Sequence, residues 1–117
     1  MAKNMLITKA EMDKLLANGK KSPTDPSFDP KPVIKLFNPV GAGTWLISEI
    51  DPENPDIAFG LADLGAGSPE LGSISLAEIK AVRLRFGLKI ERDRHFTPTM
   101  TIGQYADAAR TAGAIRA

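Results

Sequence analysis

The sequence predicts an α+β domain: an antiparallel sheet of four or five strands in a meander, with a helix packed on one face and additional helices at both ends. Three helix-start signals of the capping-box type support this, since each places Ser or Thr three residues before Glu or Gln. Between the first two lie segments rich in β-branched and aromatic residues, separated by Gly- and Pro-containing turns. The length of 117 residues and the hydrophobic fraction of 43% predict one domain over residues 1–117, with its core at about 33–96.

The N-terminal segment predicts a helix over 8–19. Thr8 and Glu11 form the first capping box, and Gly19 is placed to end the helix. Three prolines follow between Lys20 and Lys31, and this spacing predicts an extended surface connection.

The central segment predicts four strands. Residues 33–38 and 44–50 read as a hairpin whose loop contains two glycines, and the only Trp lies in its second strand. Residues 56–63 and 70–74 are the third and fourth strands. The first and third loops of a meander fall at the same end of the sheet, so residues 41–43 should lie beside residues 65–67.

The C-terminal part predicts two more helices. Ser75 and Glu78 form the second capping box, and Leu76, Ile79, Val82 and Phe86 suggest a helix that Gly87 ends. Residues 88–93 alternate and predict a fifth strand. The third capping box starts a helix over 101–112, after which residues 113–117 have little apolar surface to bury.

Composition limits the chemistry that the chain supports. There is no cysteine, which excludes disulfides and thiolate metal sites, and no apolar run approaches the roughly 20 residues of a membrane span. We therefore expect a cytoplasmic protein without membrane contact. Charge is uneven: residues 36–79 hold seven acidic side chains and no Lys or Arg, whereas residues 80–117 hold eight basic and three acidic side chains. The simpler interpretation is a sheet and its loops kept soluble by acids, with basic helices beside them, and the alternative is a bipolar surface that meets a charged partner.

No catalytic residue, metal site or cofactor is predicted. Neither Gly-Ala-Gly loop leads into a helix, so neither matches a nucleotide-binding fingerprint, and turn glycines are the simpler interpretation. His95 is the only histidine and lies in a polar cluster that fits ion pairs better than acid–base chemistry. Trp45 and Phe37 could stack a base, but core packing is the better interpretation.

Several ordered motifs between Val33 and Phe96 resemble one family. They are Val-Ile-Lys-Leu-Phe-Asn-Pro at 33–39, Gly-Thr-Trp at 43–45, residues 49–52, Phe-Gly-Leu at 59–61, Asp-Leu-Gly at 63–65, Pro-Glu-Leu-Gly at 69–72, Ser-Leu-Ala-Glu at 75–78, Gly-Leu-Lys-Ile-Glu-Arg-Asp at 87–93 and His-Phe. They resemble the DUF2958 family of small bacterial proteins, often encoded on plasmids and other mobile elements. The resemblance implies no established activity. The proline-rich segment at 22–30 and the alanine-rich tail lie outside its strongest part.

The resemblance and the charge pattern lead to three functional hypotheses. The first is a non-enzymatic accessory or protein-binding module of a mobile element, which helps DNA transfer or counteracts a host defence by binding a basic protein surface. Its candidate residues are Trp45, Glu49, Asp51, Asp63, Glu70, Glu91, Arg92, Asp93 and His95. The second is a sequence-nonspecific nucleic-acid-binding protein that uses Lys80, Arg83, Lys89, Arg92 and Arg94. The third is a metal-dependent hydrolase built on acidic residues alone. The sequence makes no prediction of oligomeric state.

Overall fold

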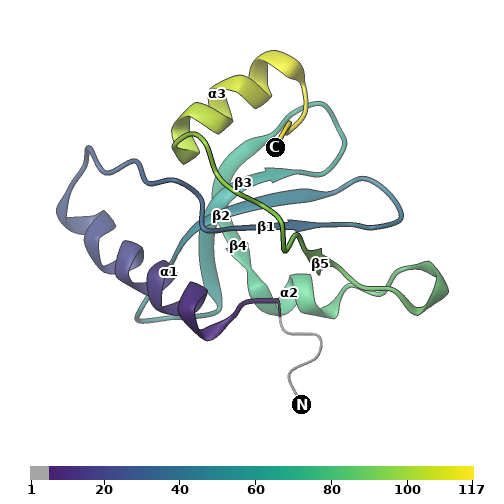
Figure 1. The fold of residues 1–117 in the computed structure, drawn as a ribbon, viewed down its shortest axis with the longest axis horizontal. Coiled ribbons are helices and arrows are strands. Elements are labelled where there is room, and N and C mark those ends of the chain that lie inside the picture. Colours follow the sequence, from purple (N-terminus) through teal and green to yellow (C-terminus); the bar gives the residue numbers. More distant parts are fainter. Residues whose placement is uncertain (1–5) are drawn as a thin grey trace.

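A computed structural model describes residues 6–117 and has the predicted α+β fold (Figure 1). Five antiparallel strands lie in the order β4-β3-β2-β1-β5, so the first four form a meander. These strands are β1 (Ile34–Phe37), β2 (Thr44–Ile50), β3 (Ile57–Asp63), β4 (Glu70–Ser75) and β5 (Glu91–Arg92). The α-helices are α1 (Lys9–Lys21), α2 (Leu76–Ala81) and α3 (Ile102–Ala112), and two short 3-10 turns are η1 (Ser22–Thr24) and η2 (Arg85–Gly87).

The sheet carries a β-bulge in β2. Ile47 pairs with Gly60 and Glu49 pairs with Phe59, so Ser48 is the extra residue on β2. The Ser48 hydroxyl donates to the Phe59 carbonyl. The backbone carbonyl of Ser48 accepts from the Asn18 side chain of α1. A Cβ placed on Gly60 would lie 1.9 Å from the Leu46 carbonyl oxygen, so the strand facing the bulge needs glycine there.

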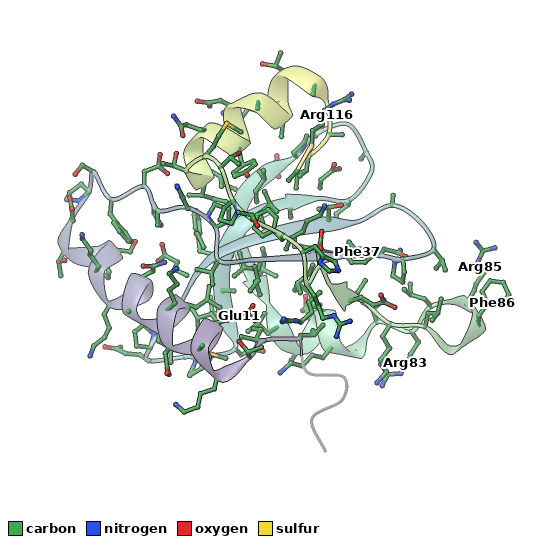
Figure 2. The ribbon with its side chains drawn as sticks, in the orientation of Figure 1. Glu11, Phe37, Arg83, Arg85, Phe86 and Arg116 are labelled. Carbon is green, nitrogen blue, oxygen red and sulfur yellow. The ribbon has the colours of Figure 1, made fainter. Side chains whose placement is uncertain are left out.

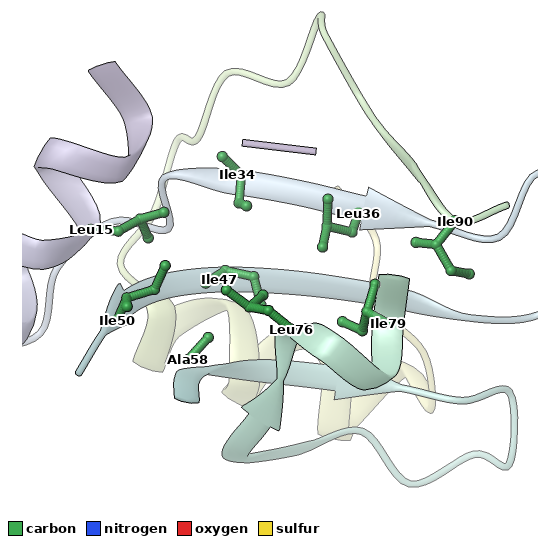
Figure 3. Close-up of a cluster of buried hydrophobic side chains, with 9 residues drawn as sticks. All are labelled: Leu15, Ile34, Leu36, Ile47, Ile50, Ala58, Leu76, Ile79 and Ile90. Atoms are coloured by element: carbon green, nitrogen blue, oxygen red, sulfur yellow. The ribbon is translucent and has the colours of Figure 1, made fainter. Parts of the chain in front are cut away.

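Helices cover both faces of the sheet, which produces two apolar clusters. On one face α1 and α2 pack over the sheet through a cluster shown in Figure 3: Leu15, Ile34, Leu36, Ile47, Ile50, Ala58, Leu76, Ile79 and Ile90. On the other face α3 packs through a second cluster: Leu46, Leu61, Ile102, Tyr105, Ala106 and Ala109. The first and third loops meet as predicted, since a Cβ on Gly65 would lie 2.4 Å from the Ala42 Cβ.

Helix α1 starts as predicted but runs past its predicted end. The Thr8 side chain accepts from the N–H of Glu11, and the Glu11 carboxylate accepts from the N–H of Thr8. The prediction that Gly19 ends the helix is wrong, because α1 continues to Lys21 and then tightens into η1. Gly19 instead allows close packing, since a Cβ there would lie 1.9 Å from the Ile50 carbonyl oxygen. The prediction of an extended connection from Lys20 is therefore wrong at its start, because the chain is helical to Lys21 and forms a 3-10 turn over Ser22–Thr24.

Helix α2 is shorter than predicted. Ser75 caps it, and the Asp56 carboxylate accepts from the Ser75 hydroxyl and from the N–H of Ala77. The prediction of a helix to Gly87 is wrong, because the chain is already extended at Val82. Val82 and Leu84 pack against the apolar cluster at a spacing of two. This strand-like alternation overrides the helical spacing of the apolar residues.

The ends of the fold are held by specific contacts. Helix α3 has the predicted capping box at Thr101 and ends at Ala112, with Gly113 in the left-handed conformation. The expectation that residues 113–117 have little to bury is wrong, because Ile115 packs on the second cluster and its N–H donates to the Asp63 carboxylate at 2.9 Å. The fifth strand exists at the edge beside β1, but it covers only residues 91–92 of the predicted 88–93.

Within residues 6–117, no helix combines the length and the apolar character that crossing a membrane requires.

Candidate functional site

Exposed cations gather on the segment that joins α2 to β5. We define the basic surface as Lys80, Arg83, Arg85, Lys89 and Arg94, all exposed. Lys80, Lys89 and Arg94, together with Arg92, line a hollow of about 650 Å³ between α2 and β5, with Ile79 and Ile90 among its other walls. Among the described residues these three cations have no ion pair within 4 Å. The exposed acid Glu91 also lines this hollow, so a polyanion would meet four cations and one carboxylate there.

Arg92 and Arg83 contribute to the fold as well. The Arg92 guanidinium lies 3.3 Å from the Glu11 carboxylate and so ties β5 to α1. Arg83 donates to the carbonyls of Lys80 and Val82, just beyond the last turn of α2. Both were predicted to bind phosphate, but these contacts show that their side chains are already partly engaged.

A narrow hairpin at the end of the basic surface projects from the body of the protein (Figures 1 and 2). The N–H of Leu84 donates to the Leu88 carbonyl at 2.9 Å, and the N–H of Leu88 donates to the Arg85 carbonyl at 3.2 Å. Phe86 at its tip is 84% exposed and has a φ of 63°, which costs a phenylalanine on the order of 1 kcal/mol. The Arg85 guanidinium lies 5.7 Å from the Phe86 ring centroid.

A second hollow, of about 380 Å³, lies between η1 and the sheet on the α3 side. Its aromatic walls are Phe28 and Phe59, and its carboxylates are Glu49 and Asp51. Burial raises the pKa of Glu49, although a hydrogen bond from Ser22 opposes that shift. The Lys21 ammonium lies 4.9 Å from the Phe28 ring centroid, so the face of this ring already receives a cation.

The remaining candidates of the predicted protein-binding site are scattered. Asp63 is only 7% exposed, and its carboxylate accepts from the N–H groups of Gly65 and Ile115, so its role is structural. Trp45 is half-buried against the first cluster, as core packing predicts. Glu70 begins β4 and is exposed.

The polar cluster at β5 does lie together. Asp93 and His95 share a shallow hollow of about 460 Å³ with Lys35, Phe37 and Arg92, beside the β1–β2 loop. Two of its charged side chains are already paired: Lys35 lies 3.6 Å from the Asp93 carboxylate, which also accepts from the backbone N–H of His95. Glu91 is exposed on the same short strand. Arg92 and Asp93 are in ion pairs, as predicted, but their partners are Glu11 of α1 and Lys35 of β1 and not residues of the cluster.

Two residues of the site were missed by sequence reasoning. Both Arg85 and Phe86 were assigned to a helix, with Phe86 on its buried side and Arg85 off it, whereas the structure ends α2 before them and exposes Phe86 as well as Arg85. The available signal was the alternation of Val82, Arg83, Leu84 and Arg85, which has the period of an extended chain.

The acids of residues 6–117 do not converge on a metal site. No group of three or more His, Asp or Glu side chains in this range has the proximity that would hold a metal ion. The hypothesis of an acid-only hydrolase therefore has no cluster of ligands in the described chain to support it.

Comparison with known proteins gives one match. A family model described as a protein of unknown function, DUF2958, matches residues 6–116. No curated protein and no solved structure matches the chain. The match extends beyond 33–96 at both ends, so the proline-rich segment and the tail lie within the family region as well. The chain therefore belongs to the DUF2958 family.

Proposed function

We propose that this protein is a cytoplasmic, non-enzymatic accessory protein of a bacterial mobile element, and that it binds nucleic acid without reading its sequence. The observation that supports the proposal is the basic surface. Lys80 comes from α2, Lys89 directly follows the projecting hairpin and Arg94 lies after β5, yet all three line one hollow. Contacts of this type bind phosphates and carry no base specificity.

The distribution of the other charges supports the same proposal. Of the acids predicted to bind a partner, Asp63 is engaged by backbone N–H groups and Asp93 lies in an ion pair with Lys35. Lys80, Lys89 and Arg94 line one hollow with Glu91 as its one acid, whereas the remaining acids are spread over several elements. A phosphate backbone therefore finds a better complement than a basic protein does.

Charge reversal of the hollow tests this function. The triple variant Lys80→Glu, Lys89→Glu, Arg94→Glu is expected to bind a labelled 20-mer DNA on the order of a hundredfold more weakly at about 0.1 M salt, because phosphates then face carboxylates. The slope of log affinity against log salt should fall by about three, one for each cation reversed. Fluorescence anisotropy across a salt series measures both quantities.

A matched control separates this surface from net charge. The triple variant Lys20→Glu, Lys31→Glu, Arg116→Glu makes the same charge change with exposed residues of other elements. It should retain most of the affinity. Equal losses in the two triple variants would show attraction to the whole protein and not to this surface, and the absence of DNA binding by the wild type would refute the proposal.

A second candidate function is capture of a basic protein segment by the hollow at Glu49. Two aromatic rings and two carboxylates line it, a combination that suits a Lys or Arg side chain. The contact of Lys21 with Phe28 is an intramolecular example of that recognition. This observation favours the protein-binding hypothesis on a site smaller than the one predicted, with Glu49 and Asp51 as its charged members.

Neutralising the two carboxylates tests the second candidate. The variant Glu49→Gln, Asp51→Asn is expected to bind a deca-lysine peptide roughly tenfold more weakly in calorimetric titration, because it loses two charge-assisted contacts. Burial favours the neutral form of Glu49, so wild-type binding should also weaken as pH falls through its raised pKa. The control variant Glu70→Gln, Glu78→Gln removes two exposed acids elsewhere, and an equal loss there would rule out a specific hollow.

A further inference from the structure

Residues Arg83–Leu88 form a projecting hairpin that phosphate binding alone does not explain. A surface that only grips phosphates needs cations, yet the most exposed large apolar side chain among the described residues, Phe86, lies at this tip. It also holds a positive φ, a conformation that a bulky residue rarely adopts. Backbone strain of this type concentrates at functional positions.

The hairpin is built to hold Phe86 outward. Val82 and Leu84 pack inward on the first apolar cluster, and alternation turns Arg83 and Arg85 outward. Two backbone hydrogen bonds between Arg85, Leu84 and Leu88 close the turn, and Gly87 follows with a φ of 71°. Figure 2 shows Arg85 and Phe86 together at the far end of the loop. The turn therefore presents the Phe86 ring to solvent, where a ligand can reach it.

We propose that Phe86 stacks on an unpaired nucleobase while Arg83, Arg85 and Lys89 hold the adjacent phosphates, so that the protein prefers single-stranded over double-stranded nucleic acid. This inference rests on the proposed nucleic-acid binding and adds the substrate class. An aromatic face accepts any base, so stacking adds affinity without sequence preference. In a duplex the base faces are already stacked, and a projecting ring has no free face to contact.

Charge complementarity identifies the occupant. Arg85 directly precedes Phe86 at the tip, Arg83 lies three positions before Phe86, and the nearest lysine, Lys89, follows the hairpin. The Arg85 guanidinium lies 5.7 Å from the ring centroid, so a nucleotide whose phosphate binds Arg85 brings its base within reach of the ring. An apolar protein pocket would accept the phenyl ring but would leave these cations facing no anion.

The test compares labelled oligo(dT) 20-mer with a 20-base-pair duplex on the full chain. Phe86→Ala and Phe86→Leu are expected to weaken binding of the single strand about tenfold, with the duplex affinity and the salt slope unchanged. Phe86→Trp should retain the single-strand affinity. Placed in a Trp45→Phe background, the new indole is the only one, and oligo(dT) should quench its fluorescence.

Leu64→Ala is the matched control, because Leu64 is 67% exposed on the β3–β4 loop, which contains no Lys or Arg. It should bind both probes as the wild type does. Circular dichroism checks that each variant folds. We expect the Phe86 variants to fold, because the side chain they replace is 84% exposed.

The outcomes separate this inference from the function beneath it. If neither the single strand nor the duplex binds, the nucleic-acid function is refuted and the stacking inference with it. Binding that is unchanged in Phe86→Ala, without quenching in Phe86→Trp, overturns the stacking inference alone and leaves phosphate binding intact. Displacement of oligo(dT) by polyglutamate at equal charge concentration would also overturn it, because the tip would then recognise any acidic polymer, including an acidic protein.

Discussion

Gly60→Ala should lower the free energy of unfolding by about 3 kcal/mol, the upper part of the range for overpacking a buried site. The added Cβ would lie 1.9 Å from the Leu46 carbonyl oxygen and 2.9 Å from its carbon. Both are backbone atoms of the neighbouring strand, so no side-chain rotation relieves the contact and the β2–β3 pairing must open. Urea denaturation followed by Trp45 fluorescence measures the change.

Gly72 offers the matched control for this substitution. It is the cross-strand partner of Gly60 in β4, and a Cβ there meets nothing within 4 Å. Gly72→Ala should therefore change stability by no more than about 0.5 kcal/mol. Equal effects of the two substitutions would mean that the bulge at Ser48 does not bring β2 and β3 as close as the structure shows.

Gly19→Ala is expected to cost about 2 kcal/mol, although alanine is the better helix former by roughly 1 kcal/mol. The new methyl would lie 1.9 Å from the Ile50 carbonyl oxygen and 3.2 Å from the Pro52 Cδ. Helix α1 would have to move off β2, which would also stretch the hydrogen bond from Asn18 to the Ser48 carbonyl. Thermal and urea unfolding report the loss.

Gly103, a helical glycine whose nearest neighbour is a side chain and not backbone, provides the comparison. At Gly103 in α3 the nearest atom to an added Cβ is an Asp29 carboxylate oxygen at 2.8 Å, on an exposed side chain that can shift if its hydrogen bonds with Thr101 and Gly103 lengthen. Gly103→Ala should change stability by about 1 kcal/mol or less. Stability retained in Gly19→Ala would contradict the close packing of α1 on β2.

The sheet was predictable because its signals are local. The hairpin from Val33 to Ile50 and the strand at 57–63 each carry their own β-rich run and turn residues, so the meander follows from the sequence order. The capping boxes at Thr8 and Thr101 are likewise complete within four residues. Local chemistry of this type needs no knowledge of distant contacts.

The errors arose where a distant contact decides the structure. Glycine is the residue type that commonly ends a helix, so Gly19 was assigned that role. In the structure Gly19 packs closely against Ile50, which lies more than thirty positions along the chain. The chain is extended at Val82 and Leu84 because this conformation lets both side chains pack on the same apolar cluster. The sequence predicted that Asp63 is a surface acid. In the structure its carboxylate accepts a hydrogen bond from the N–H of Ile115 in the tail.

The candidate site was predictable only in outline. The excess of cations in residues 80–117 is visible in the composition, and the structure places Lys80, Lys89 and Arg94 around one hollow. Which cations remain unpaired depends on tertiary contacts, such as that of Arg92 with Glu11. The exposure of Phe86 depends on where α2 ends, and that end is set by packing.

The strand order also has a kinetic consequence. Each of the first three strands pairs with the next one along the chain, so the meander closes only short loops and can form early in folding. The contacts that hold the flanking segments join Asp63 to Ile115, Glu11 to Arg92 and Lys35 to Ala117, over 52, 81 and 82 positions. We expect these long-range contacts to form after the rate-limiting barrier, so that their loss accelerates unfolding and leaves the folding rate nearly unchanged.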